Sequence, residues 1–427
     1  MKLNKAASLT AIAASVLMLV ACGKQGSSSA PAAASGASGA TAAAPAAGGG
    51  GDVIRIGFTT DMSGVYSDVD GKAGAEAIQM AIDDFGGQVL GKKVELVSAD
   101  HQNKADIAAS KAREWLDQQN VQMMVGGTNS ATALATAKIM AEKKKPYFII
   151  GAGSARLTNE DCTPYNVHYA YDTVALARVA GKALIERGDK NWYFLTADYA
   201  FGHSLEKDTT TIVEAGGGKV LGSVKVPLGN SDFSSFLLQA KQSKAQVLGL
   251  ANAGGDFINS VKAANEFGLS KDMKLAGLLV FINDVHALGL KDAQGLLATT
   301  SWYWNQDDDS RKFAKRFFEK FNRMPSMLQA ADYSATTTWL NAVKAAGTTD
   351  GDAVMKVIKE TPINDMFVKD GKVREDGRLA QTMYLMQVKK PDESKEPWDY
   401  YQQVKSVPGD QAYTPLSESK CSFVKKS

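Results

Sequence analysis

The residues best suited to chemistry are hydroxyl, amide and aromatic side chains in predicted loops, and they form no catalytic motif. The sequence contains no GxSxG elbow, no HExxH helix and no Walker lysine loop. Its histidines stand far apart, without the spacing of metal ligands. They are His101, His168, His203 and His286. The sequence therefore favours a binding protein over an enzyme, and it predicts no metal site and no cofactor.

A polar segment at 128–130 offers hydrogen-bond donors to an anion. Thr128, Asn129 and Ser130 end a predicted strand and open a predicted helix. Free backbone N–H groups at a helix start, together with hydroxyl groups, suit a carboxylate. The same residue types also serve as ordinary helix caps. The residues alone leave both interpretations open.

These loops belong to a chain in which predicted strands and helices alternate. The first series has strands over 53–58, 94–98, 121–125 and 147–150, with helices over 73–85, 104–118 and 131–142. The second has strands over 192–196, 219–225, 247–251 and 274–277, with helices over 173–186, 204–214, 233–241 and 256–267. Such alternation predicts two parallel α/β units covered by helices.

The last third of the sequence predicts a return to the first unit. It has an extended segment, three helices and two late strands, over 297–304, 310–323, 328–346, 352–360, 381–389 and 398–404. Chain crossings near 168–171, 301–304 and 379–383 would make a hinge between two lobes. We expect one lobe from 53–170 plus 302–380, the other from 171–301 plus 381–413, and a C-terminal tail over 414–427.

The N-terminus has the pattern of an export signal. Lys2 and Lys5 precede an apolar run over 6–20 that is too short to span a bilayer. The run ends in Leu-Val-Ala-Cys22, which resembles a bacterial lipobox and predicts removal of 1–21 and lipidation of Cys22. A plain secretory signal is the alternative. Residues 22–52 are mostly Gly, Ser, Ala and Pro after the cysteine, as expected of a flexible linker.

Charge and cysteine content narrow the class further. Without Lys2 and Lys5, the 48 basic residues fall to 46 and balance the 46 acidic residues, so a nucleic-acid partner is not expected. Cys22 leaves Cys162 and Cys421 as an even pair in an oxidising compartment. We expect a disulfide that ties the tail to the first lobe; two buried free thiols are the alternative.

Several loops together resemble the periplasmic leucine/isoleucine/valine-type binding proteins of ABC importers. They read TTDMSGVYSDVDGKAGAEA (59–77), GGTNSATALA (126–135), IGAGSARLT (150–158), DYAFGHS (198–204) and ANAGGDF (251–257). The resemblance covers residue 53 to about residue 404 and implies a type I periplasmic-binding fold. The segment 376–401 and the positions of Cys162 and Cys421 are most similar to aromatic-acid-binding members.

The resemblance implies a ligand site between the lobes. Its residues are Tyr66, Thr128, Asn129, Ser130, Ala152, Ser154, Tyr199, Phe201, Asn252 and Asp256. Tyr66 would cover the apolar part of the ligand, and Tyr199 and Phe201 would close from the second lobe. The alternatives are a solvent-facing Tyr66, and packing of Tyr199 and Phe201 into the core of their own lobe.

One departure from the family pattern bears on the ligand. Amino-acid-binding members carry an acidic residue after the last strand of the second lobe, whereas this sequence reads GLLVFIND over 277–284. A buried ammonium without a counter-charge costs several kcal/mol. An aromatic or aliphatic carboxylate is therefore favoured over a branched-chain amino acid, unless Asp284 reaches the site.

The lipobox pattern predicts an N-terminal lipid anchor, and the resemblance implies a monomer in the periplasm. Its lobes would close on a small carboxylate and present it to ABC permease subunits in the inner membrane. A ligand sensor of the same fold and a branched-chain amino acid binder are the alternatives.

Overall fold

The fold is described from a computed structural model of the 427-residue chain. The structure describes residues 53–425. The predicted signal segment 1–21, the lipidation site Cys22 and the linker 22–52 lie outside the described residues.

The first sheet has six strands in the order β2-β3-β1-β4-β5-β6. All neighbours run parallel except β2, which is antiparallel to β3. The strands are β1 (Val53–Thr60), β2 (Gln88–Val89), β3 (Lys92–Asp100), β4 (Val121–Gly126), β5 (Tyr147–Ile149) and β6 (Asn166–His168). Every residue of β4 and β5 is buried. Burial on both faces requires helices on both sides of the sheet.

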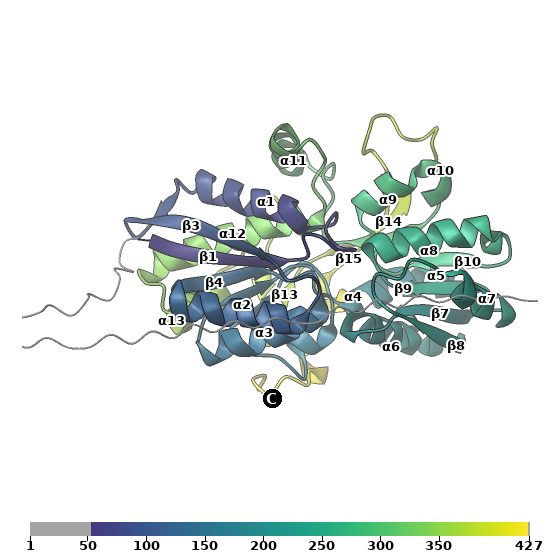
Figure 1. The fold of residues 1–427 in the computed structure, drawn as a ribbon, viewed down its shortest axis with the longest axis horizontal. Helices are drawn as coiled ribbons and strands as arrows, with labels where there is room; N and C mark the ends of the chain where they lie inside the picture. The colour runs from purple at the N-terminus through teal and green to yellow at the C-terminus, as the bar shows by residue number, and fades with distance from the viewer. Residues whose placement is uncertain (1–52, 426–427) are drawn as a thin grey trace, which may run out of the picture. The chain divides into compact units, whose positions relative to one another are not determined.

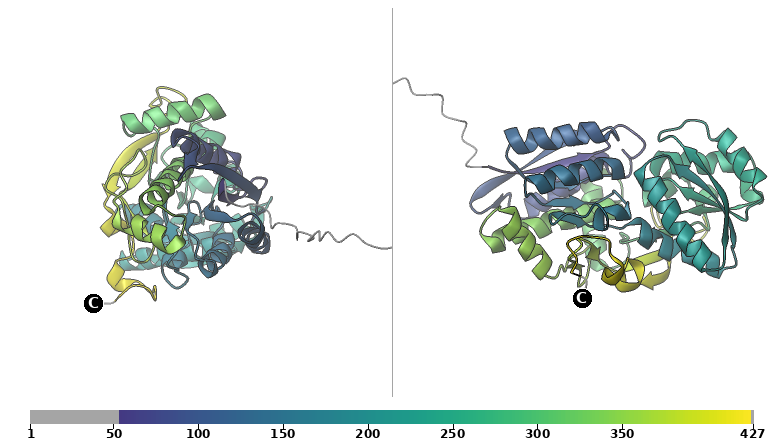
Figure 2. Two further views of the ribbon diagram at one scale, coloured as in Figure 1. Left: turned by 90° about the vertical axis from the view of Figure 1, so that its left-hand side faces the viewer. Right: turned by 90° about the horizontal axis from the view of Figure 1, so that it is seen from below.

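Two pairs of helices meet that requirement, as Figure 1 and the right-hand view of Figure 2 show. Helix α1 (Gly71–Asp84) packs against α12 (Met327–Ala346), and α2 (Ala105–Gln118) packs against α3 (Ser130–Glu142). Helix α11 (Asp308–Phe321) contacts α1, and α13 (Gly351–Glu360) contacts α12. A β-carbon on Gly57 would lie 2.8 Å from the Trp115 ring, so glycine in β1 lets α2 approach the sheet closely.

The second sheet has four parallel strands in the order β10-β9-β7-β8. They are β7 (Asn191–Ala197), β8 (Lys219–Val226), β9 (Val247–Ala251) and β10 (Lys274–Gly277). The helices of this unit are α4 (Thr173–Leu176), α5 (Lys182–Glu186), α6 (Ala200–Ala215), α7 (Ser234–Gln242), α8 (Gly254–Glu266), α9 (Ile282–Leu288) and α10 (Leu290–Ala293).

A third, antiparallel sheet follows the two parallel ones. Its strands are β11 (Leu297–Thr300), β14 (Met383–Val388) and β15 (Tyr401–Val407), in the order β11-β14-β15. A short pair precedes β14, formed by β12 (Lys372–Val373) and β13 (Leu379–Ala380), and α14 (Gly409–Ala412) follows β15. The sequence predicted these late strands but not their pairing into a sheet of their own.

The chain passes three times between the parts of this architecture. The passages follow β6, β11 and β13. Arg378, which is fully buried, donates to the carbonyl oxygens of Tyr169 at 2.7 Å and Tyr171 at 2.8 Å. Its guanidinium also lies over the ring of Tyr413, 4.6 Å from the centroid. One buried arginine thus ties the first and third passages to Tyr413, the residue before the tail.

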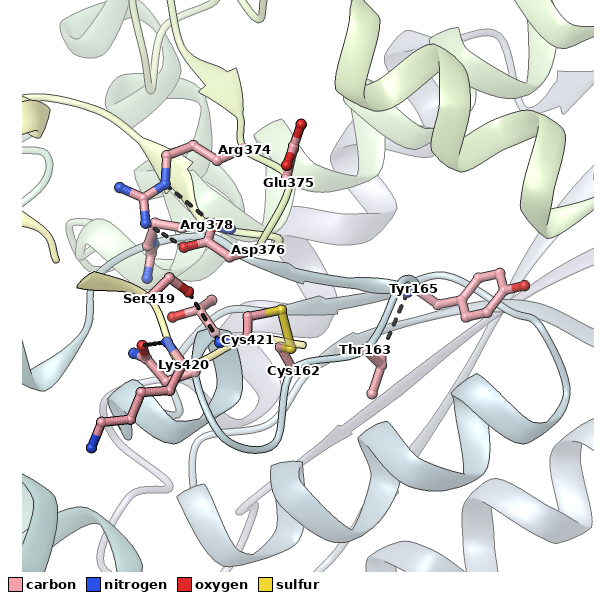
Figure 3. Close-up of a disulfide and its surroundings, with 12 residues drawn as sticks. Cys162, Thr163, Tyr165, Arg374, Glu375, Asp376, Arg378, Ser419, Lys420 and Cys421 are labelled. Atoms are coloured by element: carbon pink, nitrogen blue, oxygen red, sulfur yellow. Dashed lines mark hydrogen bonds and ion pairs between the residues drawn. A yellow bond between two sulfur atoms is a disulfide. The ribbon is translucent and has the colours of Figure 1, made fainter. Parts of the chain in front are cut away.

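The C-terminal tail is fastened to the first lobe by a disulfide between Cys162 and Cys421, shown in Figure 3. Their Cα atoms lie 5.6 Å apart, and both residues are buried with Val424. Arg374 adds a hydrogen bond to the carbonyl oxygen of Thr414 at 2.9 Å. The predicted disulfide is confirmed, and the alternative of two free thiols is wrong.

Three predicted elements need correction. The helix expected over 173–186 contains a π-helical turn at Ala177–Gly181. The extended segment over 297–304 ends as a strand at Thr300, because the Thr300 hydroxyl accepts from the Trp302 N–H at 3.3 Å and turns the chain. The strand expected over 398–404 begins only at Tyr401, since Trp398 has a φ of 71°, which a strand does not accommodate.

Candidate functional site

A small cavity lies where the carboxyl ends of the two parallel sheets meet. It is lined by Tyr66, Val69, Thr128, Gly151, Tyr171, Tyr199, Phe201, Ala253, Leu279, Phe281 and Leu328. Most of these residues lie in or close to the segment that follows a strand: β1, β4, β5 and β6 in the first sheet, and β7, β9 and β10 in the second. Open α/β sheets bind ligands at this edge, because the loops after parallel strands converge there.

The cavity is small in this arrangement. Its volume is about 10 Å³, close to the space of a single water molecule. The hydroxyl groups of Tyr66 and Tyr199 meet across it at 2.7 Å. An aromatic ring therefore enters only when these side chains or the lobes move apart.

Tyr66 is held in place by a loop that folds around Asp61. The buried Asp61 carboxylate accepts from the backbone N–H groups of Gly64 at 2.7 Å and Tyr66 at 2.9 Å. It also accepts from the Asn103 side-chain amide at 2.6 Å. These bonds fix the loop at both sides of Val65, so that the Tyr66 ring turns into the cavity.

The residues at the start of α3 divide into two roles. Asn129 caps the helix, because its side-chain oxygen accepts from Ala131 N–H at 2.8 Å and Thr132 N–H at 3.2 Å. The Thr128 hydroxyl lies 3.1 Å from that of Thr60, and Thr128 contributes to the cavity lining. The capping interpretation therefore applies to Asn129, while Thr128 faces the site.

The loop after β5 contributes Gly151 to the cavity lining, and the residues that follow are buried behind it. Ser130 Oγ accepts from Ser154 N–H at 3.1 Å, and Ser154 Oγ lies 2.8 Å from Ser204 Oγ of α6. The Ala152 carbonyl accepts from His168 Nε2 at 2.7 Å. Burial, together with the nearby Arg378 charge, holds the pKa of His168 well below its ordinary value, so this histidine is neutral.

The second lobe supplies the aromatic side of the cavity. Tyr199 and Phe201 begin α6 with ring centroids 6.1 Å apart. Burial raises the phenol pKa values of Tyr66 and Tyr199 above the ordinary value, so both stay neutral. They offer the cavity hydroxyl groups rather than charge.

Asn252 and Asp256 lie behind the lining rather than in it. Asn252 donates to Ser260 Oγ at 3.2 Å, and Asp256 accepts from Gly229 N–H at 3.0 Å. Burial raises the pKa of Asp256 to about 6. Both side chains therefore take part in the packing of the second lobe.

Four of the ten predicted site residues line the cavity: Tyr66, Thr128, Tyr199 and Phe201. The other six, Asn129, Ser130, Ala152, Ser154, Asn252 and Asp256, are buried next to it or behind it. Sequence reasoning missed Tyr171, Leu279, Phe281, Val69, Leu328, Ala253 and Gly151 as lining residues. Leu279 and Phe281 lie in the apolar run over 278–281, whose composition is that of a core segment.

The lining residues carry no formal charge. The nearby Asp284 is engaged elsewhere, because its Oδ2 accepts from the Phe281 N–H at 2.9 Å at the start of α9. Burial raises the pKa of Asp284 to about 7. An apolar cavity edged with hydroxyl groups suits a small ligand with an aromatic or aliphatic body.

Comparison with known proteins defines the class. A family model described as periplasmic binding protein matches residues 53–395, so the chain belongs to the periplasmic binding protein family. The Leu/Ile/Val-binding protein homolog 6 of Brucella melitensis is 26% identical over 275 residues, which are 62% of this chain and 68% of that protein. The resemblance seen in the loops is thereby confirmed.

Solved structures agree on the fold. A periplasmic binding protein from Burkholderia mallei is 62% identical, with a TM-score of 0.87, and the match covers 88% of this chain and all (100%) of that one. A solute-binding protein of an ABC transporter from Rhodopseudomonas palustris, in complex with 3,4-dihydroxybenzoic acid, is 23% identical with a TM-score of 0.75. That match covers 84% of this chain and 98% of the other, and it shows the shared fold.

The fold is the type I periplasmic-binding fold, with two parallel-sheet lobes joined by three chain passages. Members of this family bind solutes for ABC transporters of the branched-chain amino acid type. Within residues 53–425, no helix has the length and apolar character needed to cross a membrane.

Proposed function

We propose that this protein captures a small carboxylate, with an aromatic acid favoured, between its two closing lobes. The observation that carries the proposal is the cavity lining, which combines five aromatic side chains from both lobes with no formal charge. Closure around the ligand lets a permease recognise the loaded form. The protein acts as a carrier rather than as an enzyme.

The carboxylate is assigned to the first lobe. The first N–H groups of α3 have no acceptor within the helix, and Asn129 satisfies only those of Ala131 and Thr132. Thr128 contributes to the cavity wall at this same helix start. The positive end of the helix dipole favours an anion there. Ser130, Ala152 and Ser154 support this loop from behind.

The ligand's ring is assigned to the space between Tyr66, Tyr199, Phe201 and Phe281. Burying an aromatic ring contributes roughly 2 to 3 kcal/mol by area. A structural neighbour solved with 3,4-dihydroxybenzoic acid supports this ligand class.

A branched-chain amino acid is disfavoured because its ammonium would lack a counter-charge. Asp256 and Asp284 are outside the cavity lining, and each accepts a backbone N–H, from Gly229 and Phe281 respectively. A zwitterion would bury its positive end unpaired, at a cost of several kcal/mol.

The cellular setting follows from the N-terminal segment. We infer that residues 1–21 are removed, that Cys22 carries a lipid, and that 22–52 tether a monomer in the periplasm beside the ABC permease subunits. In this view the lobes comprise 53–170 plus 302–380 and 171–301 plus 381–413, with 414–427 as the tail. Mass spectrometry of the mature N-terminus tests the anchor: an unmodified terminus at any other residue contradicts it.

Thermal unfolding with a ligand panel tests the proposed ligand class. A ligand that binds only the folded state raises the melting temperature. We expect benzoate and 3-phenylpropanoate to raise it and leucine, isoleucine and valine to leave it unchanged. The opposite pattern would make the protein an amino-acid carrier.

A further inference from the structure

The loop between β1 and α1 contacts the second lobe at a point outside the cavity lining. The Val65 carbonyl oxygen at its tip accepts from the Gly255 backbone N–H at 2.9 Å. Gly255 lies in the first turn of α8, where N–H groups have no acceptor within the helix. A backbone carbonyl group of the first lobe thus pairs with an N–H group at the start of a helix in the second lobe.

The position of the Val65 carbonyl is set within its own lobe. Asp61 accepts from the N–H groups of Gly64 and Tyr66, the two neighbours of Val65. The Tyr66 carbonyl in turn accepts from Val69 N–H at 3.1 Å. The tip of the loop therefore meets α8 as a preformed shape, with little conformational entropy to lose.

Glycines in the second lobe make room for this tip. A β-carbon on Gly254 would lie 2.5 Å from the Val65 carbonyl oxygen and 3.0 Å from the Tyr66 ring. A β-carbon on Gly255 would lie 3.4 Å from the Val65 β-carbon, and one on Gly229 would lie 3.8 Å from Val65 Cγ1. Any side chain at Gly254 would hold the loop away from α8.

We propose that Val65, Gly254 and Gly255 form an interlobe latch that stabilises the closed arrangement through contacts in which the ligand takes no part. The latch rests on the proposed function in one respect, which is that closure of the two lobes retains the ligand. Apparent affinity depends on the population of the binding-competent arrangement, so latch residues determine affinity without touching the ligand.

The first test compares two alanine substitutions at the two ends of α8. Gly254 has a φ of +56° and Gly268 a φ of +65°, so Gly254→Ala and Gly268→Ala impose similar backbone strain. Only Gly254→Ala meets the other lobe, because nothing lies within 4 Å of a β-carbon at Gly268. We expect Gly254→Ala to weaken benzoate binding about tenfold or more and to enlarge the radius of gyration, with Gly268→Ala near wild type. Equal behaviour of the two variants overturns the latch.

The second test needs no ligand. The β-carbon distance of 3.4 Å between Val65 and Gly255 is close to that of a disulfide. We expect Val65→Cys with Gly255→Cys to crosslink under oxidising conditions. Val65→Cys with Gly268→Cys should not, since α8 is 13 residues long and separates the two glycines by roughly 20 Å.

The two tests separate the latch from the proposed function. Absence of the Val65–Gly255 crosslink overturns the latch, even if benzoate binds. A crosslink that forms in a protein that binds no aromatic acid supports the latch and contradicts the proposed ligand class. The crosslink is read by mass spectrometry of the intact chain after thiol blocking.

Discussion

At the scale of single residues, the hydroxyl groups of Tyr66 and Tyr199 are the direct polar contact across the cavity. Their 2.7 Å separation joins the two lobes at the ligand site. Both phenols are neutral, because burial raises their pKa values. The bond between them can therefore be exchanged for bonds to a ligand without moving a charge.

Removing one of these hydroxyl groups should weaken ligand binding. In Tyr199→Phe the ring stays, but the hydroxyl group that would bond to the ligand is lost, which corresponds to about 0.5 to 1.5 kcal/mol. We expect benzoate affinity to fall by the equivalent of this range in a titration. Tyr384→Phe, on β14 and outside the cavity lining, is the matched control. A Tyr199→Phe variant that binds as tightly as the control would refute this role.

Asp284 makes a pH-dependent contribution to stability. Burial raises its pKa to about 7, whereas an aspartate in an unfolded chain titrates near about 3.9. Between these values the folded form keeps a proton that the unfolded form has lost, so the free energy of unfolding falls as pH rises. The contribution lost by about pH 7 is at most about 4 kcal/mol.

Asp284→Asn should remove this dependence. The amide oxygen still accepts from the Phe281 N–H, but the side chain no longer ionises. We expect the variant to gain stability over the wild type as pH rises from about 4 to about 7, measured by urea unfolding. Asp208 and Asp256 also have raised pKa values, and both are present in the wild type and in the variant. Only the difference between the two plots of unfolding free energy against pH therefore reports on Asp284. A constant difference across this range would show that Asp284 does not titrate there.

At the scale of elements, the alternation of strands and helices predicted both parallel sheets from sequence. Hydrophobic periodicity indicates the helices, and short apolar runs bounded by polar loops indicate the strands. A strand that is buried on both faces is apolar along nearly its whole length, so such a run is recognisable in the sequence. The short β6, at Asn166–His168, escaped detection because its three residues give no usable pattern. The π-helical turn at Ala177–Gly181 was missed since it lies inside an otherwise regular helical pattern.

The candidate site could be predicted only where a strand-end loop carries polar or aromatic residues. Thr128 and Tyr199 have such signals, whereas Leu279 and Phe281 have the composition of a core segment. Ser130 and Ser154 have the right residue types, but the Ser130 hydroxyl accepts from the Ser154 N–H and the Ser154 hydroxyl bonds to that of Ser204. Which of two adjacent hydroxyl groups faces a cavity depends on backbone direction, and residue type does not determine it.

The C-terminal tail is an element whose stability depends on a covalent link. Cys162 and Cys421 are 259 residues apart in sequence. Just before the tail, the Arg178 side chain donates to the Tyr413 carbonyl oxygen at 2.5 Å. Closing so long a loop restricts the unfolded chain, by up to about 5 kcal/mol in the chain-entropy account. We expect Cys162→Ser with Cys421→Ser to lower the free energy of unfolding by several kcal/mol. A loss below about 1 kcal/mol would show that noncovalent contacts alone hold the tail.

At the scale of the whole molecule, the proposed function makes binding an equilibrium between open and closed lobes. The cavity of about 10 Å³ leaves no space for an aromatic ring, so entry requires the lobes or the tyrosines to move. Three chain passages with the buried Arg378 between them constrain that motion to a hinge. The ligand and the latch at Val65 then both favour closure, and their contributions to affinity are separable by mutation.

Isothermal titration calorimetry of the mature protein with benzoate and with leucine measures the proposed ligand preference itself. The uncharged cavity lining and the donors at the start of α3 predict a benzoate dissociation constant that is micromolar or tighter, and weak or no leucine binding. The same preparation should release heat with 3-phenylpropanoate if the ring occupies the aromatic side of the cavity. Submicromolar binding of leucine or isoleucine, with no heat from either aromatic acid, would contradict the account, because an unpaired ammonium would then be tolerated in the cavity.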